Sequence, residues 1–303
     1  MDSLMERELE STVQSMHGNG SFIPGSVRLL DYDTTNNNVL IRGSACFGTP
    51  GFGIAELTQA IAQDTNFAAA KAAGISLSSN PVVIDFCLIG FAPDTKDQGI
   101  VDTEMTWFTN TPPTLNGESG PYPVYIPSSN TANPGMMVYW PILAIGGIAP
   151  TQAGEAWPVS PASSIGADQT DFNFTGLISA IHHALTGNVT ALPNAPASLT
   201  SISNAIIYIH CDSGVNRTGA AAVGYLMSYG SQVNALSLPS MPSTPYTVAQ
   251  AQTAANLAPP SNDTSPPGGS DIPVACAYCN LLSTGIVDAT LVEECVPLNL
   301  SLG

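Results

Sequence analysis

One stretch of the chain brings together side chains that can act on a phosphate group, and it reads IIYIHCDSGVNRTGA between Ile206 and Ala220. Cys211 is followed, after five intervening residues, by Arg217. A cysteine thiolate is a strong nucleophile, and the planar guanidinium of an arginine can hold two phosphate oxygens at once. The spacing therefore suggests that the arginine binds a phosphate dianion while the sulfur attacks its phosphorus.

Such a pair works only if a strand, a tight loop and a helix hold it. Residues 205–209 form an apolar run typical of a buried strand, and the small residues of 219–228 predict a helix. The loop between them would point successive backbone N–H groups at one concavity, where the helix N-terminus adds the positive end of its dipole. Gly214 permits the tight loop, and Gly219 permits the helix to pack closely on the sheet.

The motif HCDSGVNRTG follows the pattern His-Cys-x5-Arg-Thr/Ser-Gly. It resembles the active-site signature of the cysteine-dependent phosphatases, the protein-tyrosine and dual-specificity phosphatase superfamily. The resemblance implies hydrolysis of a phosphate monoester through a phosphocysteine intermediate, with no metal ion and no cofactor. It also implies an α/β fold in which a short twisted central sheet is flanked by helices, with the phosphate-binding loop between a buried strand and a helix.

The resemblance implies a role for each residue of the motif. Cys211 would be the nucleophile, Thr218 would hydrogen-bond the thiolate and help it to leave, and His210 would orient the loop from the strand end. The phosphate oxygens would be bound by the loop, which consists of Asp212, Ser213, Gly214, Val215, Asn216 and Arg217.

The resemblance also implies an upstream aspartic acid that protonates the leaving oxygen and then activates water. The candidates in a loop before the motif are Asp168 and Asp171. Asp171 begins a helical pattern and suits its N-cap, so Asp168 is the preferred general acid and Asp171 the alternative. Trp157-Pro158 resembles the family's Trp-Pro-Asp loop, but Val159 stands where the aspartate would be.

The composition of the loop bears on the substrate. Family members that act on inositol polyphosphates or phosphoinositides carry additional lysines or arginines in or near the loop, whereas this loop holds only Arg217. Asp212 directly follows the nucleophile, and its carboxylate would oppose a bound dianion unless it faces away. We therefore expect the partner to be a phosphorylated protein or a small phosphate monoester.

Two other functions use the same residues. A catalytically inactive relative would bind phosphate or a phosphopeptide without turnover. A thiol redox or arsenate-reductase-like enzyme would use Cys211 together with Cys276 and Cys279, although in arsenate reductases of this type the Cys-x5-Arg loop lies near the N-terminus. Cys276, Cys279 and Cys295 are interpreted otherwise as structural thiols, because they lack a convincing fourth metal ligand.

Charge and composition exclude several classes of function. The chain has six Lys plus Arg against 23 Asp plus Glu, a net charge of −17, and only 10% charged residues. Binding of nucleic acid or of an anionic membrane surface requires clustered cations, so neither is expected. The 44% of hydrophobic residues argues against disorder and allows a sizeable core.

The expected compartment is reducing and cytoplasmic. The acidic start of the sequence lacks the basic and apolar regions of a secretory signal, and no apolar run is long enough to span a bilayer. Six cysteines in 303 residues do not make a disulfide scaffold. The two lysines, Lys71 and Lys96, limit ubiquitination and are compatible with an effector delivered into another cell. The oligomeric state is left open.

Alternating strand and helix patterns predict an α/β fold. The expected domains are a helical segment at 1–19, a catalytic domain at 20–258, and a linker with a C-terminal extension at 259–303. The expected strands are 39–41, 82–89, 136–145 and 205–209, and the expected helices are 54–73, 172–185, 219–228 and 246–257. Prolines predict loops through 91–135, and Pro141 predicts an edge position for the third strand.

Overall fold

The computed structural model describes residues 22–47, 53–90, 96–115, 122–141 and 174–230, together with Ala251, Ala255 and Tyr278. In this part of the chain six strands form one sheet. They are β1 (Arg28–Asp33), β2 (Asn38–Ser44), β3 (Val82–Cys87), β4 (Val124–Pro127), β5 (Gly135–Tyr139) and β6 (Ala205–Cys211). The strand order is β1-β2-β6-β3-β5-β4. The four inner strands are parallel, whereas β1 and β4 pair antiparallel at the two edges.

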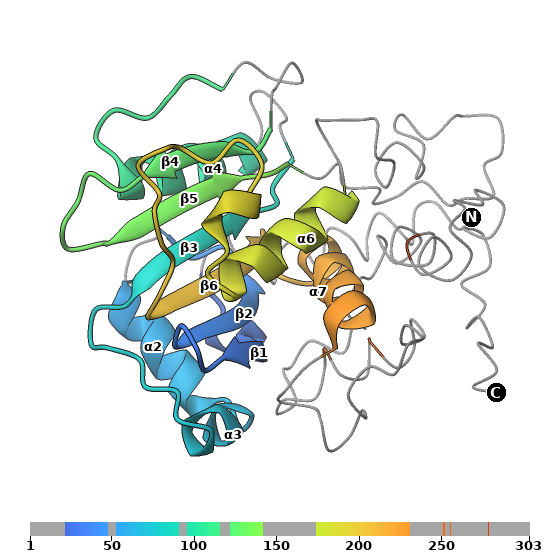
Figure 1. Ribbon diagram of the computed structural model, residues 1–303. Helices are drawn as coiled ribbons and strands as arrows, with labels where there is room; N and C mark the ends of the chain where they lie inside the picture. Colours follow the sequence, from blue (N-terminus) through green and yellow to red (C-terminus); the bar gives the residue numbers. More distant parts are fainter. Residues whose placement is uncertain are drawn as a thin grey trace, which may run out of the picture.

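Helices cover both faces of this mixed sheet, so the fold class is α/β. The helices are α2 (Ile54–Gln63), α3 (Phe67–Ala72), α4 (Lys96–Phe108), α6 (Phe174–Leu185) and α7 (Asn216–Tyr229), with short 3-10 turns η1 (Pro24–Ser26) and η2 (Val189–Ala191). Helices α6 and α7 lie side by side on one face, and α4 lies behind the sheet in the same view (Figure 1). None of the helices in the described ranges is long and apolar enough to cross a membrane.

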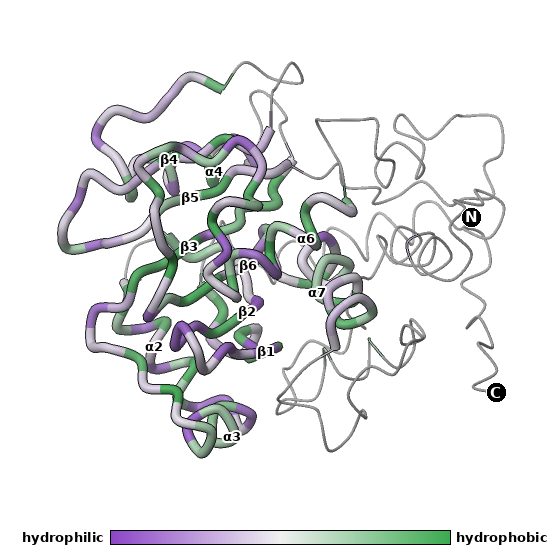
Figure 2. Tube along the Cα trace, in the orientation of Figure 1, coloured by the Kyte–Doolittle hydropathy of each residue, from purple (hydrophilic) through white to green (hydrophobic). Residues whose placement is uncertain are grey.

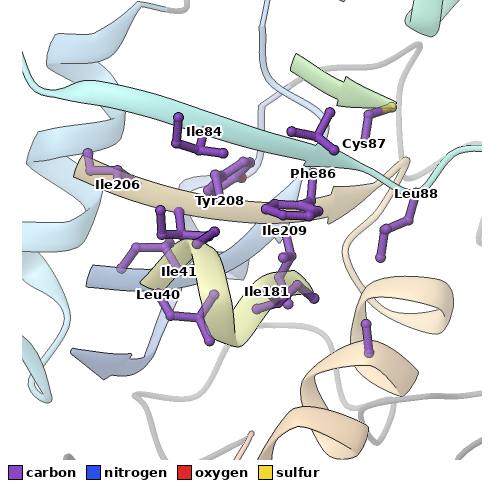
Figure 3. Close-up of a cluster of buried hydrophobic side chains, with 14 of the residues drawn as sticks. Leu40, Ile41, Ile84, Phe86, Cys87, Leu88, Ile181, Ile206, Tyr208 and Ile209 are labelled. Carbon is purple, nitrogen blue, oxygen red and sulfur yellow. The ribbon is translucent and has the colours of Figure 1, made fainter. Parts of the chain in front are cut away.

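The strand β6 lies at the centre of the sheet, between β2 and β3. All seven of its residues are buried, which explains why its sequence is an almost unbroken apolar run rather than an alternating one. Figure 3 shows the apolar packing around it, including Phe86 of β3, Ile181 of α6 and Ile209 of β6. Hydrophobic residues follow the strands, and hydrophilic residues follow much of the connecting loops (Figure 2).

The expectation of loops through 91–135 is wrong, because α4 and β4 lie within that segment. Helix α4 buries Ile100, Val101, Met105 and Phe108, which recur at the spacing of one helical face. The prolines that suggested loops flank the helix or lie beyond it. The many prolines of this segment therefore concealed the short amphipathic helix pattern that lies between them.

The edge position expected for the strand near Pro141 is also wrong. Strand β5 ends at Tyr139, and it pairs with β3 on one side and β4 on the other. Because Pro141 follows the strand, its missing N–H costs the sheet no hydrogen bond.

Other elements differ from expectation in their limits. Strand β1 has no counterpart among the expected strands. The helix expected over 54–73 is divided into α2 and α3, because the Asp64 carboxylate turns away to accept hydrogen bonds from the N–H groups of Leu29 and Asn66, each at 2.7 Å. Helix α7 begins at Asn216, three residues before the expected start at Gly219.

Candidate active site

The connection between β6 and α7 carries the motif singled out in the sequence. Strand β6 ends at Cys211, residues 212–215 form the β6–α7 loop, and α7 begins at Asn216. The loop therefore lies at the carboxyl end of the inner parallel strands, the edge of an open α/β sheet where ligands ordinarily bind. Gly214 has a φ of +80°, and a Cβ at this position would lie 2.5 Å from the carbonyl oxygen of Gly43. Only glycine fits this close approach of two backbones.

Two carbonyl groups of the loop are held from behind by hydrogen bonds from β2 and from the residue that follows it. The backbone N–H of Ala45 donates to the Asp212 carbonyl at 3.0 Å, and Nη1 of Arg42 donates to the Gly214 carbonyl at 3.2 Å. Among the described residues, the N–H groups of Ser213, Gly214 and Val215 donate to no acceptor. A loop with two of its carbonyls turned away into hydrogen bonds and with three N–H groups available is suited to receive an anion.

The loop is bordered by the functional side chains of the motif. Cys211 is 2% exposed, and Thr218 and Arg217 lie on the first turn of α7, both buried. The Thr218 Oγ1 has no hydrogen-bond partner among the residues described. The side chains of Asp212, Ser213 and Val215 are half-buried. The Cys211 thiol, the Arg217 guanidinium and the backbone N–H groups thus lie at one loop. Together they can bind an oxyanion and attack its central atom.

Arg217 makes an ion pair that the sequence did not indicate. Its Nη1 and Nη2 lie 3.2 and 3.3 Å from Oδ2 of Asp97, near the start of α4. The Asp97 side chain is 29% exposed, so a carboxylate stands beside the guanidinium at the edge of solvent. Asp97 could have been found from its position in the chain, because it lies soon after β3, whose carboxyl end adjoins that of β6.

Arg42 is the second cation of the site, and it too was missed. It is 6% exposed, and besides Gly214 it donates from Nε to the carbonyl of Ala255 at 3.2 Å. Because its hydrogen bonds go to backbone carbonyls, no pattern of side chains in the sequence could reveal its role.

His210 points to the other face of the sheet from Cys211, since successive side chains of a strand alternate. Its ring stacks on that of Tyr208, with centroids 5.6 Å apart. Its Nδ1 donates to the carbonyl of Cys211 at 3.1 Å, because a carbonyl oxygen can only accept. His210 thus binds the backbone at the start of the loop, and Leu88 does so too, donating its N–H to the His210 carbonyl at 2.9 Å.

Behind the loop His210 meets two buried carboxylates. Its Nε2 lies 3.0 Å from Oδ1 of Asp85 and 3.4 Å from Oε2 of Glu104, and all three side chains are fully buried. Burial raises the pKa of Glu104 to about 8, with the Asp85 carboxylate adding to the effect. Burial also raises the pKa of Asp85. Although burial alone would lower it, the two carboxylates raise the pKa of His210 well above its usual range.

The structure brings His210, Cys211, Arg217 and Thr218 together around one loop. Asp168 and Asp171, the expected general acid and its alternative, lie outside the described residues, as do Cys276, Cys279 and Cys295. The segments 1–19 and 259–303 fall there as well, apart from Tyr278. Comparison with protein-family models, with curated proteins and with solved structures finds no match for this chain.

Proposed function

We propose that this chain hydrolyses phosphate monoesters as a cysteine-dependent phosphatase of the protein-tyrosine or dual-specificity type. The observation that carries the proposal is the β6–α7 loop, in which the Asp212 and Gly214 carbonyls are held from behind while three successive N–H groups have no acceptor among the described residues. The nucleophile Cys211 ends the strand before this loop, and Arg217 follows it on the first turn of the helix. This strand–loop–helix is the phosphatase-like phosphate-binding loop of the proposal.

The reaction proceeds in two displacements. The Cys211 sulfur attacks phosphorus, and the S–P bond forms as the bond to the leaving oxygen breaks. Arg217 and the loop N–H groups stabilise the charge on the other phosphate oxygens during this step. Water then attacks the phosphocysteine, the S–P bond breaks, and the products are inorganic phosphate and the thiolate, with Thr218 stabilising the departing sulfur.

Asp97 is the general acid that the described residues offer. Its contact with Arg217 puts its carboxyl group beside the guanidinium that would bind the phosphate. In its protonated form Asp97 would give its proton to the leaving oxygen in the first step, and the resulting carboxylate would take a proton from the attacking water in the second. The guanidinium has five N–H donors, so it can hold phosphate and Asp97 together.

The charge of the chain limits how substrate is bound. A net charge of −17 repels a dianion at long range, so binding depends on contacts within the loop. Arg217 is the loop's own cation, with Arg42 directly behind it. This favours a phosphorylated protein, which adds apolar and backbone contacts, or a small aryl phosphate over a polyphosphorylated ligand.

The test is hydrolysis of p-nitrophenyl phosphate and of a phosphotyrosine peptide by the full chain. We expect Cys211→Ser to lower the rate by at least about 1,000-fold, because no other group replaces the nucleophile. The matched control is Cys46→Ser, which alters an equally buried cysteine outside the loop and should retain activity. Acid quenching during turnover should leave a phosphate on Cys211, detectable by mass spectrometry.

Three outcomes would overturn the proposal. Turnover that survives in Cys211→Ser would exclude the phosphocysteine route. Tight binding of a phosphopeptide by the wild-type chain without release of phosphate would favour the inactive binding module. Loss of activity in a Cys276→Ser/Cys279→Ser double variant would favour thiol redox or arsenate-reductase-like chemistry.

A further inference from the structure

A second group of reactive side chains lies behind the β6–α7 loop, on the face of the sheet that α4 covers. It consists of Asp85 and Cys87 of β3, Glu104 of α4 and His210 of β6, called the buried cluster below. All four side chains are fully buried. Cys87 and His210 are register partners on adjacent parallel strands, so their side chains point to the same face. Figure 3 shows Cys87 at the end of β3.

The buried cluster is polar but poorly satisfied. Both carboxylate oxygens of Asp85, both of Glu104 and Nε2 of His210 make no hydrogen bond of good geometry among the described residues, although the Cys46 N–H and the Cys87 thiol approach Glu104. Burying a carboxylate without hydrogen bonds costs far more than burying a neutral group. The imidazole is within ion-pair distance of both carboxylates, but the atoms do not have the geometry of a hydrogen bond. The cluster therefore holds two buried carboxylates against one imidazole, which can compensate the charge of only one of them.

The spacing of these atoms matches the ligands of a tetrahedral metal ion. Nitrogen and oxygen ligands about 2.0–2.1 Å from zinc stand about 3.3 Å apart at the tetrahedral angle. His210 Nε2 lies 3.0 Å from Asp85 and 3.4 Å from Glu104. The ligand atoms of Cys87, Glu104 and His210 all lie within 4.8 Å of one another. These three ligand atoms can surround a common centre, and the Asp85 carboxylate lies beside them, 3.0 Å from Nε2 of His210.

The orientation of His210 supports the same conclusion. Its Nδ1 donates to the Cys211 carbonyl and its Nε2 points at the two carboxylates, so a metal ion that displaces the Nε2 proton would meet a lone pair there. Metal-binding histidines almost always donate their second ring nitrogen to a carbonyl or a carboxylate in this way.

We propose that Cys87, Glu104 and His210 bind a divalent transition-metal ion, with zinc as the ion that fits best and with Asp85, next to Nε2 of His210, as the carboxylate that completes the site. A thiolate and an imidazole disfavour calcium and magnesium, which prefer oxygen ligands. Four protein ligands leave no open position, so the ion is structural rather than catalytic. The ion would join the ends of β3 and β6 to α4. Strand β6 carries His210 of the proposed active site, and α4 carries Asp97. The ion would lie on the opposite side of the sheet from Cys211, so the inference does not depend on the proposed phosphatase activity.

The experiment measures metal in the purified full chain, without chelators or affinity metals. After addition of zinc and dialysis we expect one zinc per chain by elemental analysis. The zinc should be replaceable by Co²⁺ with a thiolate-to-cobalt absorption band in the near ultraviolet. Cys87→Ser should abolish that band and lower zinc affinity by at least about 100-fold, since even the loss of a group that only supports a ligand costs 10- to 100-fold. Circular dichroism of each variant reports whether it has folded.

Two controls distinguish this site from the other cysteines. Cys211→Ser, which should abolish the proposed phosphatase activity, should keep both zinc and the cobalt band. The Cys276→Ser/Cys279→Ser double variant should keep them as well. If the wild-type chain binds no zinc, the inference is wrong whatever its phosphatase activity. If a folded Cys87→Ser keeps the cobalt band, or the double variant loses it, the ion is bound elsewhere. If Glu104→Gln binds zinc as tightly as the wild type does, Glu104 is not a ligand and the four-residue site is wrong.

Discussion

Oδ2 of Asp97 lies 3.2 Å from Nη1 and 3.3 Å from Nη2 of Arg217, although the two residues are 120 positions apart in the sequence. A single carboxylate oxygen thus bridges both terminal nitrogens of the arginine proposed to bind phosphate. The contact links α4 to the first turn of α7 across the open edge of the β6–α7 loop. The contact gives the proposed site a carboxyl group, which was expected to come from Asp168 or Asp171, much later in the chain.

If Asp97 is the general acid, Asp97→Asn should slow poor leaving groups much more than good ones. A general acid contributes typically about 10²- to 10⁴-fold, so we expect a loss of that order for phenyl phosphate. The loss should be smaller for p-nitrophenyl phosphate, whose leaving group needs little protonation. The measurement is kcat for both substrates. Asp102→Asn, which alters an exposed carboxylate on the same helix, should leave both rates unchanged. An equal loss for the two substrates would assign Asp97 to positioning Arg217 instead.

The sequence predicts the β6–α7 segment well because its determinants are local. An apolar strand, a glycine that permits positive φ and a run of small helical residues stand side by side in the chain. Asp97 and Arg42 could not be predicted in this way. Asp97 reaches the site only because β3 and β6 are neighbours in the sheet, and Arg42 acts through backbone carbonyls.

The buried cluster could be predicted from the sequence only in part. Asp85 interrupts an otherwise apolar strand, which is the kind of anomaly that marks a buried polar site. Its partner Glu104 lies on a helix that the prolines concealed, and the register of Cys87 with His210 exists only in the folded sheet. The sequence therefore contained one signal for this cluster, and only tertiary structure shows what surrounds it.

The fit of Gly214 against β2 predicts a specific cost for a side chain there. Gly214→Ala adds a methyl group 2.5 Å from the Gly43 carbonyl oxygen, at a φ of +80° that only glycine adopts easily. We expect a loss of stability of at least about 1–3 kcal/mol, together with a loss of phosphate binding because the loop must move. Urea unfolding and inhibition by inorganic phosphate measure the two effects. Gly99→Ala in α4, where the new methyl group meets no atom within 4 Å, should instead stabilise the fold by about 0.5–1 kcal/mol.

Arg42 and Arg28 form a matched pair for testing support of the loop from behind. They are register partners on β2 and β1, both are buried, and both donate to backbone carbonyls. Only Arg42 reaches the β6–α7 loop. Lysine cannot reproduce the fork that spans Gly214 and Ala255, and hydrogen bonds from charged groups are worth about 1.5–3 kcal/mol. We expect Arg42→Lys to raise KM and the inhibition constant for phosphate about tenfold or more. Arg28→Lys should lower stability without changing KM, and an equal change in both variants would mean that Arg42 has no particular role in the loop.

The net charge of −17 predicts an unusual response to salt. Long-range repulsion of a dianionic substrate is screened as the Debye length shrinks from about 30 Å at 0.01 M to about 10 Å at 0.1 M ionic strength. The short contacts with Arg217 and the loop N–H groups are screened much less. KM for an aryl phosphate should therefore fall as sodium chloride is raised over this range, while kcat changes little. Alkylation of Cys211 offers a control, since salt should accelerate the anion iodoacetate relative to neutral iodoacetamide. A KM that rises with salt would mean that attraction within the loop outweighs the repulsion by the rest of the chain.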